Sequence, residues 1–514
     1  MSPPRRAPPP RKAPGRPGAA TARGPGASRA RPGATTAKPA STGRAAPSRP
    51  ARAGAAGAPG STAARATGTP AAGRRGRPAP TARQVALRVL ARVAATDAYL
   101  NVVLDAALDE AGLADGRDAG LATELCYGTS RRQATLDAVL AGFSDRRLET
   151  LEDVVLAALR VGAYQVFFTR VPRHAAVADT VEALKACGLA RATGFVNAVL
   201  RKVAALPELP PPPPGSEAEQ LAYTHGHPTW LVSRWLQHFG PARTRAMLAA
   251  DNESPALAVR ANTTRVSRDA LVAQLTEAGV ACRPTALSPA GAVLESPGRV
   301  EDLYGFAEGL FQVQDEAAQL VTVYAQVPPG ARVLDACAAP GGKACHLAET
   351  AAVTAVELHA NKLPRMAAEA RRLGLTLRLA TLDASRPLPD EYRDFDVVFV
   401  DAPCSGLGTL RRHPELRWRR QEADLPGLAS LQRAILEACQ AAVRPGGLLV
   451  YAVCTTEPLE GADQVELFLR SHPEYTSEPP VGLGHLPLSQ GYLRTRPGPE
   501  GLDGFFAARL RRMY

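Results

Sequence analysis

Two cysteines follow apolar segments that are typical of buried strands, at positions where a side chain could do chemistry. Cys404 ends the tetrapeptide DAPC after "DVVFV", and Cys454 lies in "YAVCTT" after "GLLV". A cysteine in such a place can be a nucleophile, a metal ligand or a small buried hydrophobic residue. None of the eight cysteines forms a C-x-x-C pair, so no structural zinc site and no other metal is expected. Any chemistry here would use single thiols.

A glycine loop and two carboxylates predict a nucleoside site. In "DACAAPGGK", Gly341 and Gly342 let the backbone approach a ligand closely. Glu357 ends the next strand-like segment, where a carboxylate accepts hydrogen bonds from ribose hydroxyls, and Asp383 ends the third, within reach of an adenine edge. Because no G-K-[ST] phosphate loop is present, we expect an adenosine without a phosphate chain, and S-adenosylmethionine fits. The alternative is that the two acids only cap helices or turns.

These residues need a framework that brings strand ends together, and the chain from Gly330 onward predicts one. Helical segments alternate there with the strand-like "ARVLDAC", "VTAVEL", "LRLATLD", "DVVFVDA" and "GLLVYAVC". Nearly continuous apolar strands are typical of a parallel sheet covered on both faces, which binds ligands beyond the carboxyl ends of its strands. The fourth and fifth strands are neighbours in this topology, so both thiols should face one cleft. We predict an α/β, Rossmann-like domain with a mostly parallel sheet over residues 321–514.

The chain before this domain changes character three times. From residue 81 to 206, apolar residues recur at helical spacing, as in "LEDVVLAALRVGAYQVFF", which predicts an all-α domain. Residues 207–216 contain a proline run that forbids helix and predicts a stiff linker. Residues 217–320 mix helical and strand-like segments, which predicts a small α+β domain.

Residues 1–80 are a basic tail that is set apart by its composition. They carry 16 of the chain's 61 Lys and Arg residues and none of its 49 Asp and Glu residues, so the rest of the chain has a net charge of −4. A segment rich in Pro, Gly, Ala and Arg cannot bury enough apolar surface to fold, so we expect disorder. It is either an arm for a polyanion or a solvated extension. The sequence has neither an apolar signal run nor about 18 consecutive apolar residues, so we expect a cytoplasmic protein with reduced thiols and no membrane partner.

The motifs of the C-terminal half resemble those of RNA cytosine-C5 methyltransferases. The matching stretches are "DACAAPGGK", "DAPCSG", "RRHPELRW" and "LLVYAVCTTEPLEG". Upstream, "LATELCYGTSRRQATLD" and "RATGFVNAVLRKV" resemble the RNA-binding protein NusB. Such a fusion is similar to the RsmB (Fmu/Sun) type of 16S ribosomal RNA methyltransferase, and only the first 80 residues fall outside the resemblance. It implies a multidomain protein with a NusB-like helical domain that binds RNA, an RNA-recognition-like middle domain and a methyltransferase domain.

The resemblance also implies a reaction and roles for individual residues. The reaction transfers a methyl group from S-adenosyl-L-methionine to C5 of a specific cytosine in 16S ribosomal RNA. Cytosine C5 is a poor nucleophile, and a thiolate that adds to C6 activates it through a covalent intermediate. Cys454 is implied as that nucleophile, Cys404 as the residue that helps release the product, and Asp401 as the acid that positions the base at N3. The family's Thr-Cys-Ser motif is altered here, because Val453 precedes the thiol and Thr455 follows it.

The same resemblance assigns further residues to the cofactor, and charge and aromatic character assign others to RNA. The implied cofactor-binding residues are Cys337, Ala338, Ala339, Pro340, Gly341, Gly342, Lys343, Glu357, Asp383 and Asp401. RNA sequence is read mainly in single strands and loops, so the target cytosine has to be unstacked into the cleft. Charge and a stacking surface beside Cys404 are expected from Arg411, Arg412, Arg417, Trp418, Arg419 and Arg420. An ordinary charged loop is the alternative for this segment, and we expect the protein to act as a monomer.

Other functions remain open at this point. Within the same chemistry, the substrate could be a tRNA cytosine or another ribosomal cytosine. A protein of a different class would be a non-catalytic RNA-binding or ribosome assembly factor, although Cys454, Asp401 and the glycine loop are all intact. An adenine amino-methyltransferase would carry an Asn/Asp-Pro-Pro-aromatic tetrapeptide, which DAPC matches poorly. A DNA cytosine methyltransferase would use the Pro-Cys thiol, Cys404, as its nucleophile.

Overall fold

The computed structural model describes residues 79–113, 116–295 and 298–514, which belong to one unit of the chain, residues 76–514. The prediction of a disordered tail over residues 1–80 therefore falls outside the described residues, except at its last two positions. Within the described ranges, no helix is long and apolar enough to cross a bilayer. The same ranges contain no cluster of three or more His, Cys, Asp or Glu side chains that could hold a metal ion.

The first part of the described chain is all-helical, as predicted. Its helices are α1 (Ala82–Ala95), α2 (Leu100–Ala111), α3 (Arg117–Arg131), α4 (Gln133–Ala141), α5 (Asp153–Phe168), α6 (Arg173–Ala186) and α7 (Thr193–Ala204). α1 begins at Ala82 because Thr81 and Gln84 form a capping box, in which each side chain accepts a hydrogen bond from the other residue's backbone N–H. α5 is the most buried of these helices, and α1, α3, α4, α6 and α7 all contact it.

Two helices follow this domain in the chain and pack away from the middle sheet. α8 (Glu217–His225) begins at a capping box formed by Ser216, and α9 (Thr229–Ala250) bends where Gly240 takes a φ of 75° before Pro241. Their apolar side chains share a core with the segment that follows Cys404. That core includes Leu221, Leu231, Trp235, Leu407, Leu410, Leu416 and Leu425. The two helices therefore support the loop on which one of the two candidate cysteines lies.

The small middle domain contains an antiparallel sheet of four strands in the order β2-β3-β1-β4. The strands are β1 (Leu257–Ala261), β2 (Cys282–Pro284), β3 (Gly291–Leu294) and β4 (Phe311–Val313). α10 (Arg268–Glu277) begins where the Ser267 hydroxyl accepts a hydrogen bond from the N–H of Ala270. Leu271 and Leu275 of this helix pack on Val259 and Phe311 of the sheet. This arrangement confirms the predicted α+β character.

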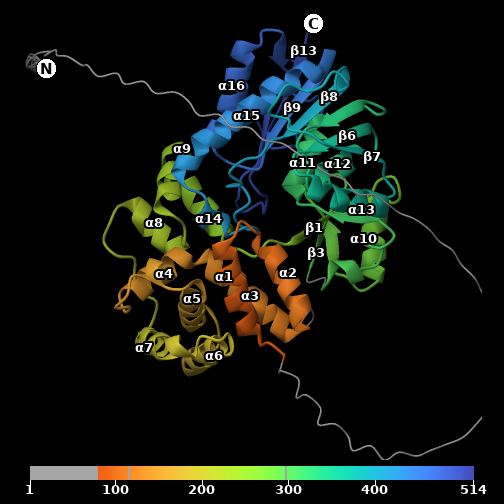
Figure 1. Ribbon diagram of the computed structural model, residues 1–514. Helices are drawn as coiled ribbons and strands as arrows, with labels where there is room; N and C mark the ends of the chain where they lie inside the picture. The colour runs from red at the N-terminus through yellow and green to blue at the C-terminus, as the bar shows by residue number, and fades with distance from the viewer. Residues whose placement is uncertain (1–78, 114–115, 296–297) are drawn as a thin grey trace, which may run out of the picture. The chain divides into compact units, whose positions relative to one another are not determined.

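The C-terminal domain contains a nine-stranded sheet, and its parallel part carries the predicted motifs (Figure 1). Its strands are β5 (Arg332–Asp335), β6 (Ala352–Glu357), β7 (Leu377–Thr381), β8 (Phe395–Asp401), β9 (Val443–Val453), β10 (Tyr475–Ser477), β11 (Leu488–Ser489), β12 (Tyr492–Arg494) and β13 (Phe506–Arg512). The order is β11-β12-β13-β9-β8-β5-β6-β7, and β10 pairs with β13. The strands from β9 to β7 run parallel, whereas β13 lies antiparallel to β9. The predicted Rossmann-like, mostly parallel sheet is confirmed.

Helices cover both faces of this sheet, which explains why its strands are apolar throughout. On one face lie α11 (Glu316–Ala325), α12 (Gly342–Leu347) and α13 (Leu363–Leu373), and on the other lie α15 (Leu425–Cys439) and α16 (Ala462–Ser471) (Figure 1). Alternate residues of β8 enter the two cores: Val398 packs with α15, and Phe399 packs with α11. The carboxyl ends of the strands stay free of these helices and form the site.

Candidate active site

The register of β8 and β9 brings the two candidate cysteines into contact. These parallel strands pair Asp401 with Ala452, so that Cys404 and Cys454 follow neighbouring strands at the same edge of the sheet. Their Sγ atoms are 3.3 Å apart, and both side chains are partly buried. No disulfide joins them. The two thiols therefore face one cleft, as the predicted strand order requires.

The environment of Cys404 disfavours the ionised form of its thiol. The hydrogen bond to Cys454 and then burial raise the pKa of the Cys404 thiol well above its ordinary value of 9.0. Either sulfur atom can be the donor in the contact between them.

A buried network holds the two cysteine loops in this arrangement. The Ser405 hydroxyl, next to Cys404, lies 2.9 Å from the hydroxyl of Thr455, next to Cys454. The Glu460 carboxylate accepts a hydrogen bond from the Ser405 backbone N–H at 2.8 Å and another from the Ser405 hydroxyl. The Glu460 carboxylate is fully buried, so these donors replace the water that would otherwise solvate it. Thr455, which departs from the family's serine, thus keeps a structural hydroxyl beside the thiol.

Asp401 forms the third part of the site and is paired with a lysine from the glycine loop. The Lys343 ammonium donates to Asp401 Oδ2 at 2.6 Å. Burial alone lowers the pKa of Lys343, but the charge and hydrogen bond of Asp401 outweigh it, so that the pKa lies above its ordinary value. Deeper in the sheet, burial and then the charge of Asp401 raise the pKa of Asp335 to about 7. The site therefore combines an ion pair with a carboxyl group that protonates near neutrality.

One cavity of 600 Å³ connects these groups with the predicted cofactor residues. Its lining includes both cysteines and the predicted Cys337, Ala339, Pro340, Lys343, Glu357, Asp383 and Asp401. Ala338, Gly341 and Gly342 do not line it. Gly341 takes a φ of 105°, which favours glycine, and α12 begins directly after it. Ala338, Gly341 and Gly342 therefore shape the loop, whereas the other predicted cofactor residues border the cavity.

Glu357 and Asp383 border the cavity while also accepting hydrogen bonds within their own loops. Glu357 accepts from the His359 backbone N–H and from the Lys362 ammonium, at 3.1 and 2.9 Å. Asp383 accepts from the backbone N–H and hydroxyl of Ser385, and the hydroxyl bond followed by the backbone bond lowers the pKa of Asp383. Both carboxylates therefore cap turns, as in the alternative interpretation, and also border the cavity. The two roles are compatible because each carboxylate has two oxygens that can accept several hydrogen bonds.

Arg420 lines the cavity as expected, whereas most of the other residues predicted to contact RNA have partners within the protein. Arg417 is fully buried and donates to the carbonyl oxygens of Arg131 and Asp251 at 3.0 and 2.7 Å. Arg411 and Arg412 both bind the buried carboxylate of Asp503. The terminal guanidinium nitrogens of Arg411 and Arg417 therefore have protein acceptors, whereas their buried Nε atoms have none in the described part of the chain.

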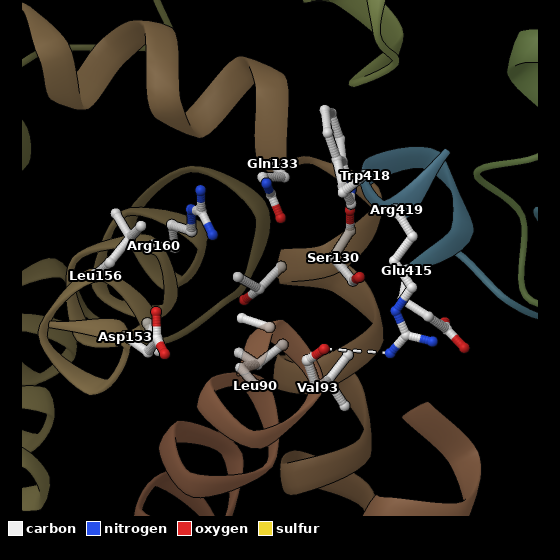
Figure 2. Close-up of a pocket in the computed structure, with 13 residues that line it drawn as sticks. Leu90, Val93, Ser130, Gln133, Asp153, Leu156, Arg160, Glu415, Trp418 and Arg419 are labelled. Carbon is white, nitrogen blue, oxygen red and sulfur yellow. Dashed lines mark hydrogen bonds between the residues drawn. The ribbon is translucent and has the colours of Figure 1, made fainter. Parts of the chain in front are cut away.

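Trp418 and Arg419 extend this contact to the helical domain. They lie in α14 (Leu416–Arg419), where the Trp418 indole N–H donates to the carbonyl oxygen of Ser130 at 2.9 Å. Figure 2 shows Trp418, Arg419 and Glu415 around a 240 Å³ cavity whose other walls come from α1, α3, α4 and α5. The dashed line marks the bond from Arg419 to the carbonyl oxygen of Val93, at 3.2 Å. α14 therefore holds the helical and catalytic domains together, and no sequence signal links it to those distant carbonyl groups.

The fold and the site together define a Rossmann-like methyltransferase, and the comparisons identify its family. The description "16S rRNA methyltransferase RsmB/F" matches residues 323–511, the NusB family matches 80–205, and a ferredoxin-like domain of RsmF/B-like methyltransferases matches 227–301. The chain belongs to the RsmB/F family of 16S rRNA methyltransferases.

Individual relatives agree with this assignment. "Ribosomal RNA small subunit methyltransferase B" of Pseudomonas putida is 39% identical over 440 residues, which cover 83% of this chain and 98% of the relative. The protein of the same name from Pseudomonas syringae pv. tomato is 37% identical over 446 residues, covering 83% and 96%. The crystal structure of PH0851 shares the fold with a TM-score of 0.74 at 24% identity, and the match covers 84% of this chain and 98% of that one.

Proposed function

We propose that the protein transfers a methyl group from S-adenosyl-L-methionine to C5 of an unstacked cytosine in 16S ribosomal RNA, with Cys454 as the nucleophile. The observation that carries this proposal is the 3.3 Å contact between the Cys404 and Cys454 sulfur atoms in a cavity shared with Asp401. A two-thiol arrangement serves a reaction that must both form and break a carbon–sulfur bond.

The residues around the cavity fit the proposed cofactor. Glu357 and Asp383 offer carboxylate oxygens for ribose hydroxyls and an adenine edge, and the loop beginning at Cys337 provides a backbone wall. When bound there, S-adenosylmethionine supplies an electrophilic methyl group. Lys343 and Asp401 lie on the side of the cavity that also contains the thiols.

The protein's own groups account for the remaining steps. Cys454 gives its proton to solvent water, and its sulfur bonds to C6 of the cytosine, which pushes electron density to C5. Asp401 holds the base at its N3 edge, and the paired Lys343 places positive charge near the negative charge that develops on the ring. After C5 has accepted the methyl group, its proton passes to solvent water, the bond between C6 and Cys454 breaks, and sulfur leaves as a thiolate. Cys404, whose sulfur lies 3.3 Å from that of Cys454, is placed to give it a proton and to regain one from solvent.

Attack is assigned to Cys454 because its position matches the nucleophile of the family's Thr-Cys-Ser motif. The alternative arrangement, with Cys404 attacking as in DNA cytosine methyltransferases, requires Cys404 to lose its proton, which the raised pKa of that thiol disfavours. A non-catalytic assembly factor would need neither thiol.

Mapping of 5-methylcytosine in 16S rRNA from cells with and without the protein tests the reaction itself. Cys454→Ala should abolish the modification, whereas Cys404→Ala should trap a denaturant-stable RNA–protein adduct after one turnover. Cys282→Ala is the matched control, because Cys282 belongs to the middle sheet and does not line the cavity. Full methylation by Cys454→Ala would refute the assignment, and an adduct with Cys454→Ala but not with Cys404→Ala would establish the reverse arrangement.

A further inference from the structure

The helical domain contributes one side chain to the catalytic cavity. Tyr99 directly precedes α2, yet it lines the same cavity as Cys404, Cys454 and Asp401. Its side chain is 46% exposed, although large aromatic residues are usually buried. No motif in the sequence singled it out, because "DAYLN" contains no catalytic pattern.

Contacts from the catalytic domain hold Tyr99 in place. The backbone N–H of Leu100 donates to the Glu415 carboxylate at 3.0 Å in a buried setting. The Tyr99 ring meets His413 edge-on, with 4.9 Å between the ring centroids and 61° between the planes. Arg419 donates to the carbonyl oxygens of Asp97 and Ala98. The segment that follows Cys404 therefore fixes the position of the Tyr99 ring relative to the two thiols.

Among the residues that line the cavity, four carry aromatic rings: Tyr99, His359, His413 and Phe505. Phe505 is 5% exposed, and the Lys343 ammonium lies 5.1 Å from its ring centroid. His413 is partly buried and is in contact with Tyr99. Tyr99 and His359 are the exposed rings in this lining, and Tyr99 is the one near the thiols, because, besides burial, Cys454 and Cys404 both raise the pKa of its phenol. Its hydroxyl has no hydrogen-bond partner within the described ranges, so the side chain is held by its backbone and ring and not by its polar end.

We propose that Tyr99 stacks on the target cytosine, so that the helical domain supplies a substrate-binding residue of the catalytic cavity. This inference rests on the proposed function. A base that leaves its stack in RNA loses favourable contacts, and an aromatic face can replace them. In the proposed reaction the Cys454 sulfur approaches C6 from one face of the base and Asp401 meets N3 at its edge, which leaves the opposite face for an aromatic ring.

The electrostatics of Tyr99 agree with this role. Burial and then the neighbouring Cys454 raise the pKa of the phenol above its ordinary value of 10.0, against the lowering effect of Arg420. The side chain therefore remains neutral and does not repel a thiolate at Cys454. A neutral aromatic face beside the nucleophile suits a base that is about to be attacked.

Steady-state methylation of 16S rRNA from cells that lack the protein tests the inference. Tyr99→Leu keeps an apolar side chain but removes the ring, and it should raise the KM for RNA by about 5- to 100-fold. Tyr99→Phe keeps the ring and should retain the wild-type KM. Affinity for S-adenosylmethionine and the melting temperature should stay unchanged in both. Tyr304→Leu is the control, because Tyr304 is 53% exposed and does not line the cavity.

Each outcome has a distinct meaning. A wild-type KM for Tyr99→Leu overturns the inference. A lower melting temperature with an unchanged KM also overturns it, because Tyr99 would then only join the two domains. If the wild-type protein itself leaves cytosine unmethylated, the proposed function fails and the inference falls with it, and the wild-type reaction identifies that case.

Discussion

Mild oxidation should join Cys404 and Cys454 and silence the enzyme reversibly. The two sulfur atoms lie 3.3 Å apart, and a disulfide bond measures about 2.05 Å, so the atoms need to approach by only about 1.2 Å. In the reaction the Cys454 thiolate is oxidised by hydrogen peroxide to a sulfenic acid, and the Cys404 thiol then displaces water from it. Two thiols and one peroxide thus yield one disulfide and two waters.

Peptide mapping by mass spectrometry after brief peroxide treatment measures this linkage directly. We expect a Cys404–Cys454 cross-link, loss of methyl transfer, and full recovery with dithiothreitol. Cys404→Ala lacks the resolving thiol, so its Cys454 should progress to sulfinic acid, which dithiothreitol does not reverse. Cys282→Ala should behave like the wild type. Irreversible oxidation of Cys454 in the wild-type protein, without a cross-link to Cys404, would refute the side-by-side placement of the thiols.

Four further predictions follow from the structure and composition. Arg417→Met leaves carbonyl groups of two domains without their donor, and it should lower the free energy of unfolding in urea by about 3 kcal/mol; a loss below about 1 kcal/mol would show that the contact is weak. Glu460→Gln loosens both cysteine loops and should reduce kcat by about 10- to 100-fold without changing affinity for S-adenosylmethionine, as binding assays would show. The pKa of Asp335 is about 7 in the folded state, against an ordinary value of 3.8. Between these two pH values the folded state binds a proton that the unfolded state does not, so the free energy of unfolding falls as the pH rises from 3.8 to about 7. Asp335→Asn should flatten this part of the pH–stability curve. Deletion of residues 1–80 should reduce the salt dependence of RNA binding, by up to about 0.7 in log–log slope for each lost phosphate contact, and an unchanged slope would mean that the tail does not bind RNA.

Much of the catalytic domain could be predicted from local sequence. Apolar runs separated by helical segments predicted β5 to β9, because a strand buried on both faces must be apolar along its length. The positions of Asp401, Cys404 and Cys454 at strand ends followed from the same pattern. The resemblance of these motifs to a methyltransferase family added the roles of the residues, and the family itself is confirmed.

The tertiary structure decided what the arginine-rich segment does. Sequence reasoning read Arg411, Arg412 and Arg417 as a basic surface, because charge is usually solvated. In the structure their partners include the carbonyl oxygens of Arg131 and Asp251 and the carboxylate of Asp503, which lie far away in the chain. A guanidinium group can bind such acceptors in a buried place only when the fold brings them together, and no local pattern records that.

The same distinction holds for the site. By itself, the sequence determined that two thiols and an aspartate follow adjacent strands, since strand order in a doubly covered sheet can be inferred from the pattern. Only the tertiary structure decided that the sulfur atoms touch, that Glu460 links the loops that carry them, and that Tyr99 of another domain borders their cavity. These facts depend on strand register and on domain packing. Both arise from contacts between residues that are remote in sequence, and such contacts leave no periodic signal in the chain.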